Sequence, residues 1–227
     1  MQEKKTETME PMDYYIVKGC DCVSNVKVFG LEDSVRAAKY PMAADLSVLD
    51  ASLTNGITNL AQSDAGSGHD NWLNGVVVQF DLTFTNKAWV EAERYHFLDF
   101  VSSQSTMHRI TKFDLDKAYI EYVDDRVVEV MKELVREYNI LCKVPQSEDI
   151  VKMKQKRYLS ILYTNPAGFR LTARMTTDYR QLKTIYHQRK DHRLPEWRMF
   201  CRWIETLPFA ELITGGEAEC EQQKISA

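Results

Sequence analysis

The sequence contains few of the residues that interrupt regular structure, and it has no long apolar segment. Only 9 of its 227 residues are glycine and 6 are proline, which excludes a collagen-like or low-complexity chain. No apolar run reaches the roughly 18 residues of a transmembrane helix. The charged start of the chain does not resemble a secretory signal. We therefore predict a cytoplasmic protein that does not contact membranes.

Cysteine is also scarce, and its spacing fits neither a disulfide framework nor a zinc site. The five cysteines, at positions 20, 22, 142, 201 and 220, form an odd set without a Cys-x-x-Cys pair. Cys20 and Cys22 are separated by one residue, which is too close for a comfortable disulfide. We expect reduced thiols and no bound metal.

An excess of basic residues is missing as well. The chain carries 29 basic and 33 acidic residues, for a net charge of −4. A protein that coats a nucleic-acid polymer needs a basic surface that releases counterions, so we predict no such partner. A small anionic ligand is still compatible with this charge, because a local cluster of arginines is enough to bind it.

The remaining composition is that of a globular protein, with 44% hydrophobic and 27% charged residues. It predicts one α+β domain over residues 13–214, between disordered tails at 1–12 and 215–227. Alternating or β-branched runs predict strands at 14–17, 76–85 and 169–176. Helical spacing predicts helices at 31–40, 46–60, 88–100, 119–138, 150–163, 179–189 and 194–207.

Three shorter segments are predicted to be irregular. Residues 63–70 are rich in glycine and serine and read as a loop, and residues 54–56 mark a break in the helix expected at 46–60. The hydroxyl-rich residues 101–106 either bind a ligand or form a turn. The 11 tyrosines, 9 phenylalanines and 4 tryptophans suit a planar cofactor or an ordinary core, and the core is the simpler explanation.

Arginine and histidine residues provide the candidates for chemistry. His69 lies in the glycine-rich loop, where it either contacts a ligand or is an ordinary surface residue, and the surface position is the simpler explanation. Arg94 and Arg109 flank the serine-rich segment, and guanidinium groups bind phosphate through a bidentate fork. The alternative is a solvated helix face followed by a loop. The familiar dinucleotide, phosphate-loop, zinc-protease and serine-hydrolase motifs are absent, so any nucleotide must bind without them.

The predicted helix at 179–189 carries a third group. Arg180 and His187 are seven residues apart and share one face, and Arg189 lies near the C-terminal end. Cations at that end are also favoured by the helix dipole alone.

Together these segments resemble the flavin-dependent thymidylate synthases, and in particular a divergent branch found in phages and anaerobic bacteria. The most specific part is residues 177–204, where the family has an Asn-x-Arg opening, an arginine two helical turns later and a tryptophan-centred helix. Asp178 stands in place of the asparagine, and Arg180 and Arg189 are at the expected positions.

The middle of the chain resembles the family more loosely. Gly68-His69-Asp70 corresponds to a Gly-His-Glu loop, and Arg94-Tyr95-His96 corresponds to an Arg-His-Arg triplet. The likeness spans roughly residues 35–213. It implies an α+β fold in which an antiparallel sheet is packed with several long helices.

The resemblance also implies roles for individual residues. The flavin contacts would be His69, His96, Asp178, Arg180 and His187. The deoxyuridylate pocket would contain Arg94, Ser103, Gln104, Arg109 and Arg189. Arg109 would bind the phosphate, and Ser105 and Arg189 would be catalytic.

The implied reaction converts dUMP to dTMP. Methylenetetrahydrofolate supplies the carbon, FAD reduced by NADPH supplies the hydride, and no cysteine nucleophile is required. Family members are homotetramers with shared sites. The altered triplet and Asp178 keep alternatives open: a hydroxymethylating or otherwise related pyrimidine-nucleotide enzyme, a catalytically impaired nucleotide-binding homologue, or a structural protein without a ligand.

Overall fold

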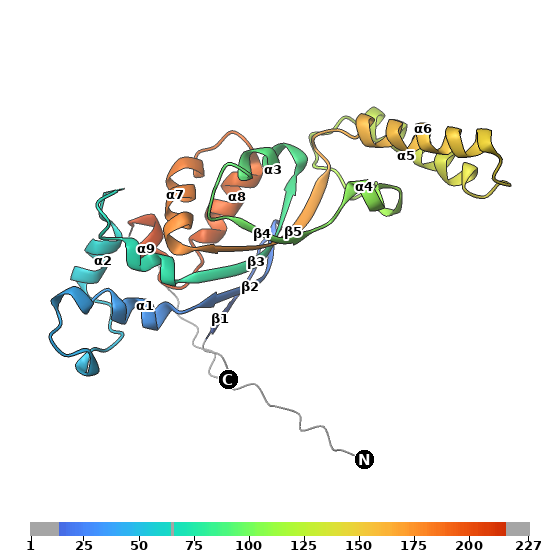
Figure 1. Ribbon diagram of the computed structural model, residues 1–227. Coiled ribbons are helices and arrows are strands. Elements are labelled where there is room, and N and C mark those ends of the chain that lie inside the picture. Colours follow the sequence, from blue (N-terminus) through green and yellow to red (C-terminus); the bar gives the residue numbers. More distant parts are fainter. Residues whose placement is uncertain (1–13, 65, 217–227) are drawn as a thin grey trace, which may run out of the picture.

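The computed structural model describes residues 14–64 and 66–216 and shows a five-stranded antiparallel sheet with helices packed on one face (Figure 1). The strands lie in the order β1-β2-β3-β5-β4. Their bounds are β1 Tyr14–Val17, β2 Val23–Phe29, β3 Val77–Thr85, β4 Asp99–Ser103 and β5 Arg170–Asp178. The predicted α+β class is confirmed. The disordered tails that we predicted lie outside the described residues, apart from Gly215 and Gly216.

The helices differ widely in length, from one turn to 17 residues. The α-helices are α1 Leu31–Ala37, α2 Asn55–Ala61, α3 Asn86–Ala92, α4 Thr106–Arg109, α5 Asp125–Leu141, α6 Glu148–Thr164, α7 Tyr179–Arg189, α8 Pro195–Ile204 and α9 Glu211–Thr214. The 3-10 turns are η1 Tyr40–Met42, η2 Leu46–Val48, η3 Asn71–Gly75 and η4 Ile110–Lys112. No helix within the described ranges is long and apolar enough to cross a bilayer.

Strands β3 and β5 form the centre of the sheet. They pair from Val77 opposite Asp178 to Thr85 opposite Arg170 without a shift in register. Alternate side chains of β3 point into the core, where Phe80 and Phe84 are fully buried. The other face is polar because successive side chains of a strand point to opposite sides.

Aromatic side chains of α8 pack against the buried face of β3. The ring of Trp197 lies 4.9 Å from that of Phe84, and the ring of Trp203 lies 5.0 Å from that of Phe80. Phe200 fills the space between them and is also fully buried. These rings account for much of the aromatic content as core.

Helices α5 and α6 form a hairpin that projects away from the sheet (Figure 1). It has a separate small core, which contains Ile110, Leu115, Ala118, Met131, Ile161 and Phe169. Because Phe169 immediately precedes β5, this core connects the hairpin to the central strand.

The prediction of one helix at 46–60 is wrong. The chain forms the short turn η2 and then α2, which begins at Asn55. Thr54, which we expected to mark a break, caps α2 by accepting a hydrogen bond from the Ile57 N–H at 3.4 Å. A threonine followed by Asn-Gly is compatible with either outcome, since the same side chain suits turns and N-caps.

Three other boundaries also differ from prediction. The helix expected at 88–100 ends at Ala92, and residues 99–103, including the first half of the expected irregular segment at 101–106, form edge strand β4. Strand β2 was not predicted, because its polar residues and bulge disturb the alternation. The helix expected at 119–138 begins only at Asp125, after the N-cap Asp124. The other predicted strands and helices are confirmed to within a few residues, and α7 has its predicted bounds.

Replacing Phe84 tests the placement of the core. Phe84→Ala should lower the free energy of unfolding by about 3–5 kcal/mol, because it leaves a cavity between β3 and α8. Urea denaturation followed by circular dichroism measures this change. The control Tyr163→Ala, where the side chain is 87% exposed, should change it by less than about 0.5 kcal/mol. Equal losses in the two variants would contradict the assigned core.

Candidate functional site

Segments that are distant in sequence meet at the carboxyl end of β5. Asp178 ends the strand and caps α7 by accepting a hydrogen bond from the Gln181 N–H at 2.8 Å. The hydroxyl of Thr177 donates to the carbonyl of Phe97 at 2.6 Å, which fixes the loop between α3 and β4. The start of α7 and this loop are therefore neighbours.

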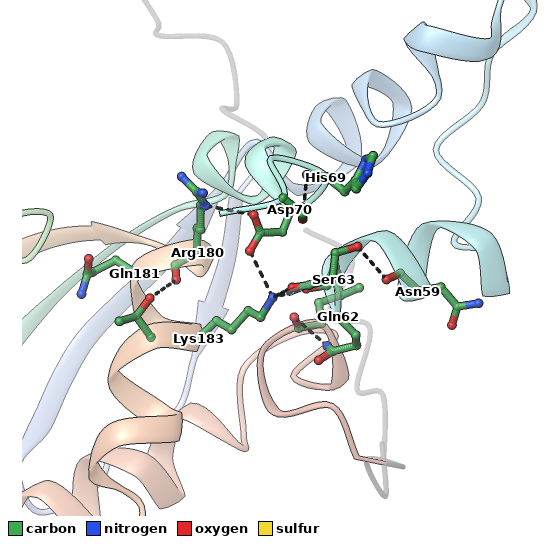
Figure 2. A network of polar contacts seen from close by, with 12 residues as sticks. Asn59, Gln62, Ser63, His69, Asp70, Arg180, Gln181 and Lys183 are labelled. Carbon is green, nitrogen blue, oxygen red and sulfur yellow. Dashed lines mark hydrogen bonds and ion pairs between the residues drawn. The ribbon is translucent and has the colours of Figure 1, made fainter. Parts of the chain in front are cut away.

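Asp70 connects a third segment to the same end of β5 (Figure 2). Its carboxylate accepts hydrogen bonds from Arg180 Nε and Lys183 Nζ, both at 3.1 Å. Lys183 also donates to the carbonyls of Ala61 and Ser63 at 2.7 and 3.0 Å. The Asp70 side chain is only 5% exposed, and a buried carboxylate needs such partners. The network holds the His69 loop against α7.

His69 lies beside this network but is exposed. Its ring points away from Asp70 in Figure 2. The backbone N–H of His69 donates a hydrogen bond to the Ser67 hydroxyl at 3.3 Å. Gly68 has a φ of 78°, in the left-handed region that favours glycine. The turn therefore presents the imidazole outward.

The Arg94-Tyr95-His96 triplet divides between the surface and the interior. Arg94 and His96 are exposed and have no side-chain hydrogen bond or ion pair with the described part of the chain. Tyr95 is half-buried and donates its hydroxyl to Gln188 Oε1 at 3.0 Å. The side chains of Arg94 and His96 are thus available to a ligand, whereas the Tyr95 side chain stabilises the packing of its loop against α7.

Arg189 lies in a largely buried cluster between α3 and α8, with 14% of its side chain exposed. Its Nε donates to the Tyr95 hydroxyl at 2.7 Å, and its Nη1 donates to Glu91 at 3.1 Å. The guanidinium carbon is 5.0 Å from the centre of the Trp197 ring. His192 Nε2 is 3.2 Å from the same Glu91 oxygen. The cluster fixes the guanidinium on three sides.

Glu91 supplies the negative charge of this cluster. Burial raises its pKa, but the hydrogen bond from Lys87 and the charges of His192, Lys87 and Arg189 outweigh that effect and lower the pKa below its ordinary value. The carboxylate is therefore ionised at neutral pH and compensates the charge of Arg189.

His187 is exposed on α7, on the face that also carries Arg180. Burial and the nearby charges of Lys190 and Lys183 lower the pKa of its imidazole. The ring is consequently neutral at physiological pH. A neutral imidazole can accept one hydrogen bond and donate another.

The serine-rich segment lies at the opposite end of β5. Gln104 exchanges two hydrogen bonds of 2.9 Å with the backbone of Thr172, one through its N–H and one through its side-chain oxygen. Ser103 and Arg109 are exposed, and Ser105 is half-buried. Since Thr172 and Asp178 are six residues apart on one strand, the two ends are separated by roughly 20 Å.

The residues that we predicted for the site therefore fall into two groups in a single chain. His69, His96, Asp178 and Arg180 lie on the segments that meet at the carboxyl end of β5, and Ser103, Gln104, Ser105 and Arg109 lie at its amino end. Arg189 lies in the cluster between them.

Sequence reasoning missed the partners that hold the arginines. Glu91 contacts Arg189 across a gap of nearly a hundred residues, and Lys183 joins Arg180 on Asp70. Only the four-residue spacing of Glu91 and Tyr95 hinted that both side chains point the same way.

Several exposed donors have the chemistry needed to bind a phosphate group. Exposed guanidinium and imidazole groups at 94, 96, 69 and 109 have no side-chain partner within the described residues. The one acid among the predicted ligands, Asp178, is occupied as an N-cap, which reduces the repulsion between it and an anion. No group of three or more metal-binding side chains is present in the described ranges.

Comparison with solved structures identifies the fold. Two structures of the flavin-dependent thymidylate synthase ThyX from Helicobacter pylori, each with FAD and dUMP, match with TM-scores of 0.60 and 0.61 at 13% and 12% identity. The matches cover 83% and 85% of this chain and 95% and 98% of theirs. The chain therefore has the fold of flavin-dependent thymidylate synthases.

A UMP/dUMP methylase, PolB from Streptomyces cacaoi, solved with 5-Br dUMP, has a TM-score of 0.48 at 15% identity. That match covers 81% of this chain and 89% of the methylase. No protein-family model matches the chain, and no curated protein matches it by sequence.

Asp178 allows a test of the charge at this site. Burial raises the pKa of its carboxyl above the ordinary value of 3.8, so the ionised form is disfavoured in the folded state. Asp178→Asn keeps an N-cap oxygen and removes this penalty. We expect the variant to be more stable than the parent at pH 7, and the difference to vanish as the pH falls below 3.8.

A second N-cap aspartate, Asp124, serves as a matched control, because the same substitution there should change stability in the opposite direction. The Arg126 side chain lowers the pKa of exposed Asp124, the N-cap of α5, so Asp124→Asn should reduce stability at pH 7. Thermal unfolding between pH 3 and pH 8 measures both variants. A loss of stability in Asp178→Asn at pH 7 would show that the carboxylate has a favourable partner.

Proposed function

We propose that this chain, which has the fold of flavin-dependent thymidylate synthases, converts dUMP to dTMP with methylenetetrahydrofolate as the carbon donor and NADPH-reduced FAD as the hydride source. The observation that carries the proposal is the convergence of three segments at the carboxyl end of β5. They are the His69 loop, the His96 loop and the start of α7. The two loops present Arg94 and two imidazoles without side-chain partners in the described residues, and α7 adds Arg180, which Asp70 holds in place.

In this proposal the exposed donors bind the two nucleotides. His69, His96, His187 and Arg180 hold FAD, and Asp178 fixes the start of α7 beside it. When bound, the flavin supplies the hydride that completes the methyl group. Arg94 holds a phosphate next to Tyr95, whose inward orientation places the arginine at the surface.

Arg189 is proposed to stabilise negative charge on the pyrimidine ring. Electron density must rise at C5 of dUMP before the carbon is transferred, and the ring oxygen O4 then gains charge. Nε and Nη1 of Arg189 are held by Tyr95 and Glu91, whereas Nη2 has no hydrogen bond within the described residues. A donor held in place before the reaction stabilises developing charge without reorganising.

The second group of residues is proposed to complete the site of another copy of the chain. Ser103, Gln104, Ser105 and Arg109 lie roughly 20 Å from Asp178 in the same chain, which is too far for both groups to contact one pyrimidine nucleotide. A homotetramer with shared sites brings the dUMP-binding serines and Arg109 to the flavin held by a neighbouring chain.

One observation favours a second candidate function. Tyr95 replaces the histidine expected in the middle of the family triplet, and it points inward to Arg189. A site with fewer flavin contacts suits an enzyme that transfers a different one-carbon group to the same nucleotide, or a homologue that only binds the nucleotide.

Product analysis tests the proposed reaction. The purified protein, incubated with FAD, NADPH, methylenetetrahydrofolate and dUMP, should yield dTMP by mass spectrometry, and omission of FAD or of NADPH should abolish it. A hydroxymethylated nucleotide would support the second candidate. Unchanged dUMP with tight nucleotide binding would indicate a binding protein. Light scattering should give four times the 26.4 kDa chain mass, and an active monomer would contradict the shared site.

Substitutions at the Arg189 cluster test its role. Arg189→Lys should lower kcat by about 100-fold, because lysine cannot keep both contacts and still donate to the ring. Glu91→Gln should lower kcat by roughly tenfold with little change in KM for dUMP, since Glu91 orients the guanidinium and does not touch substrate. Steady-state kinetics measure both variants.

The control is Arg202→Lys, at an exposed arginine of α8 without a side-chain partner in the described part of the chain. It should retain the parental kcat and KM. If Arg189→Lys also retained the parental kcat, the proposed charge stabilisation would be wrong.

A further inference from the structure

The connection between β1 and β2 contains a Cys-Asp-Cys sequence in a tight turn. Cys20 and Val23 pair through two backbone hydrogen bonds, of 2.8 and 3.1 Å, so Asp21 and Cys22 form a two-residue loop. This hairpin lies far in sequence from the residues proposed above, and the proposed function makes no use of its thiols.

The backbone around the turn leaves little freedom. A Cβ atom at Gly19 would lie 2.0 Å from the carbonyl oxygen of Val23, so only glycine fits at that position. The carbonyl of Cys22 accepts a hydrogen bond from the Thr83 N–H of β3 at 2.8 Å. The turn is therefore anchored on both sides of Asp21.

This geometry brings the two thiols together. The sulfur atoms of Cys20 and Cys22 are 3.5 Å apart. Cys20 is exposed, and Cys22 is buried with 4% of its surface accessible. The one-residue spacing alone argued against a disulfide, but in this turn the exposed Cys20 side chain needs only to rotate toward its neighbour.

The electrostatic surroundings give the two thiols different roles. The hydrogen bond from the Cys22 thiol, supported by the backbone N–H groups of Cys22 and Val23, lowers the pKa of Cys20 to about 6, although burial and the charge of Asp21 oppose it. The same hydrogen bond, together with burial, raises the pKa of Cys22. Cys20 is thus the exposed thiolate and Cys22 the protonated neighbour, an arrangement typical of redox-reactive pairs.

We propose that Cys20 and Cys22 form a redox site that exchanges with low-molecular-weight disulfides and closes to an intrachain disulfide. The Cys20 thiolate attacks one sulfur of the small disulfide and releases one thiolate. Cys22 then loses its proton, attacks the Cys20 sulfur of the mixed disulfide and releases the second thiolate. The protein loses two electrons and one proton from Cys22, and the small disulfide is reduced to two thiols or thiolates.

The other described cysteines do not share this arrangement. Cys142 is exposed at the end of α5, and Cys201 is buried in α8. Neither has a second thiol within hydrogen-bonding distance among the described residues. Cys142 therefore serves as an internal reference for an exposed thiol in the same protein.

The test uses the full chain and glutathione disulfide. Trypsin cleavage after Lys18 and Lys27 releases one peptide, residues 19–27, that contains both thiols. After exposure of the folded protein to glutathione disulfide and then iodoacetamide, this peptide should be two hydrogens lighter and unalkylated, and reduction should restore double alkylation. Alkylation of both thiols after oxidation, or a disulfide from Cys20 to any other cysteine, would overturn the proposal.

Two further measurements separate the roles of the thiols. In the untreated protein at pH 7, iodoacetamide should label Cys20 about tenfold faster than Cys142, and an equal or slower rate would contradict the assigned thiolate. Cys22→Ser should convert the transient mixed disulfide into a stable glutathione adduct on Cys20, because no resolving thiol remains. Cys142→Ser should leave the 19–27 disulfide unchanged. If Cys22→Ser fails to fold, the mass of peptide 19–27 and the labelling rates of the parental protein still decide the proposal.

Discussion

The nine-residue pairing of β3 with β5 is the constraint on which the candidate site depends. Helix α3 follows β3 at one end of the ladder, and α7 follows β5 at the other. Helices of 7 and 11 residues reach about 10 and 16 Å, and a nine-residue strand is about 30 Å long. Because the two helix lengths together nearly equal the strand length, α3 and α7 come close to each other as they run in opposite directions over the buried face of the sheet. Arg189, the last residue of α7, donates hydrogen bonds to Glu91 of α3 and to Tyr95 in the loop that follows α3.

Charge compensation explains why so many arginines near this face do not destabilise it. Glu91 neutralises Arg189, and Asp70 neutralises Arg180 together with Lys183. The cations that remain without partners are at the surface, where water solvates them in the absence of a ligand. Arg180 and Arg189 are thus held in fixed positions by acids, whereas Arg94 and Arg109 are held by no side-chain partner within the described residues. The thiols of the β1–β2 turn belong to neither set, since a flavin-dependent methylation of dUMP requires no cysteine nucleophile.

Local sequence patterns predicted most of the elements whose neighbours are close along the chain. The alternation in 76–85 and the helical spacing in 179–189 were sufficient for β3 and for α7. Strand β4 was missed because β5, the strand that it pairs with, is about 70 residues away and all five of its own residues are exposed. The start of α2 was misjudged because Thr54-Asn55-Gly56 suits a break as well as a cap.

The sequence by itself determined the charge balance, the antiparallel α+β class and the identities of the arginines and histidines that are candidates for ligand binding. Only the tertiary structure decided which of them have partners: it buried Arg189 against Glu91, exposed Arg94, and separated the serine-rich segment from Asp178. It also brought the Cys20 and Cys22 sulfur atoms together. The reason is physical, because hydrogen bonds and ion pairs depend on distances of about 3 Å in space, and the sequence specifies separations only along the chain.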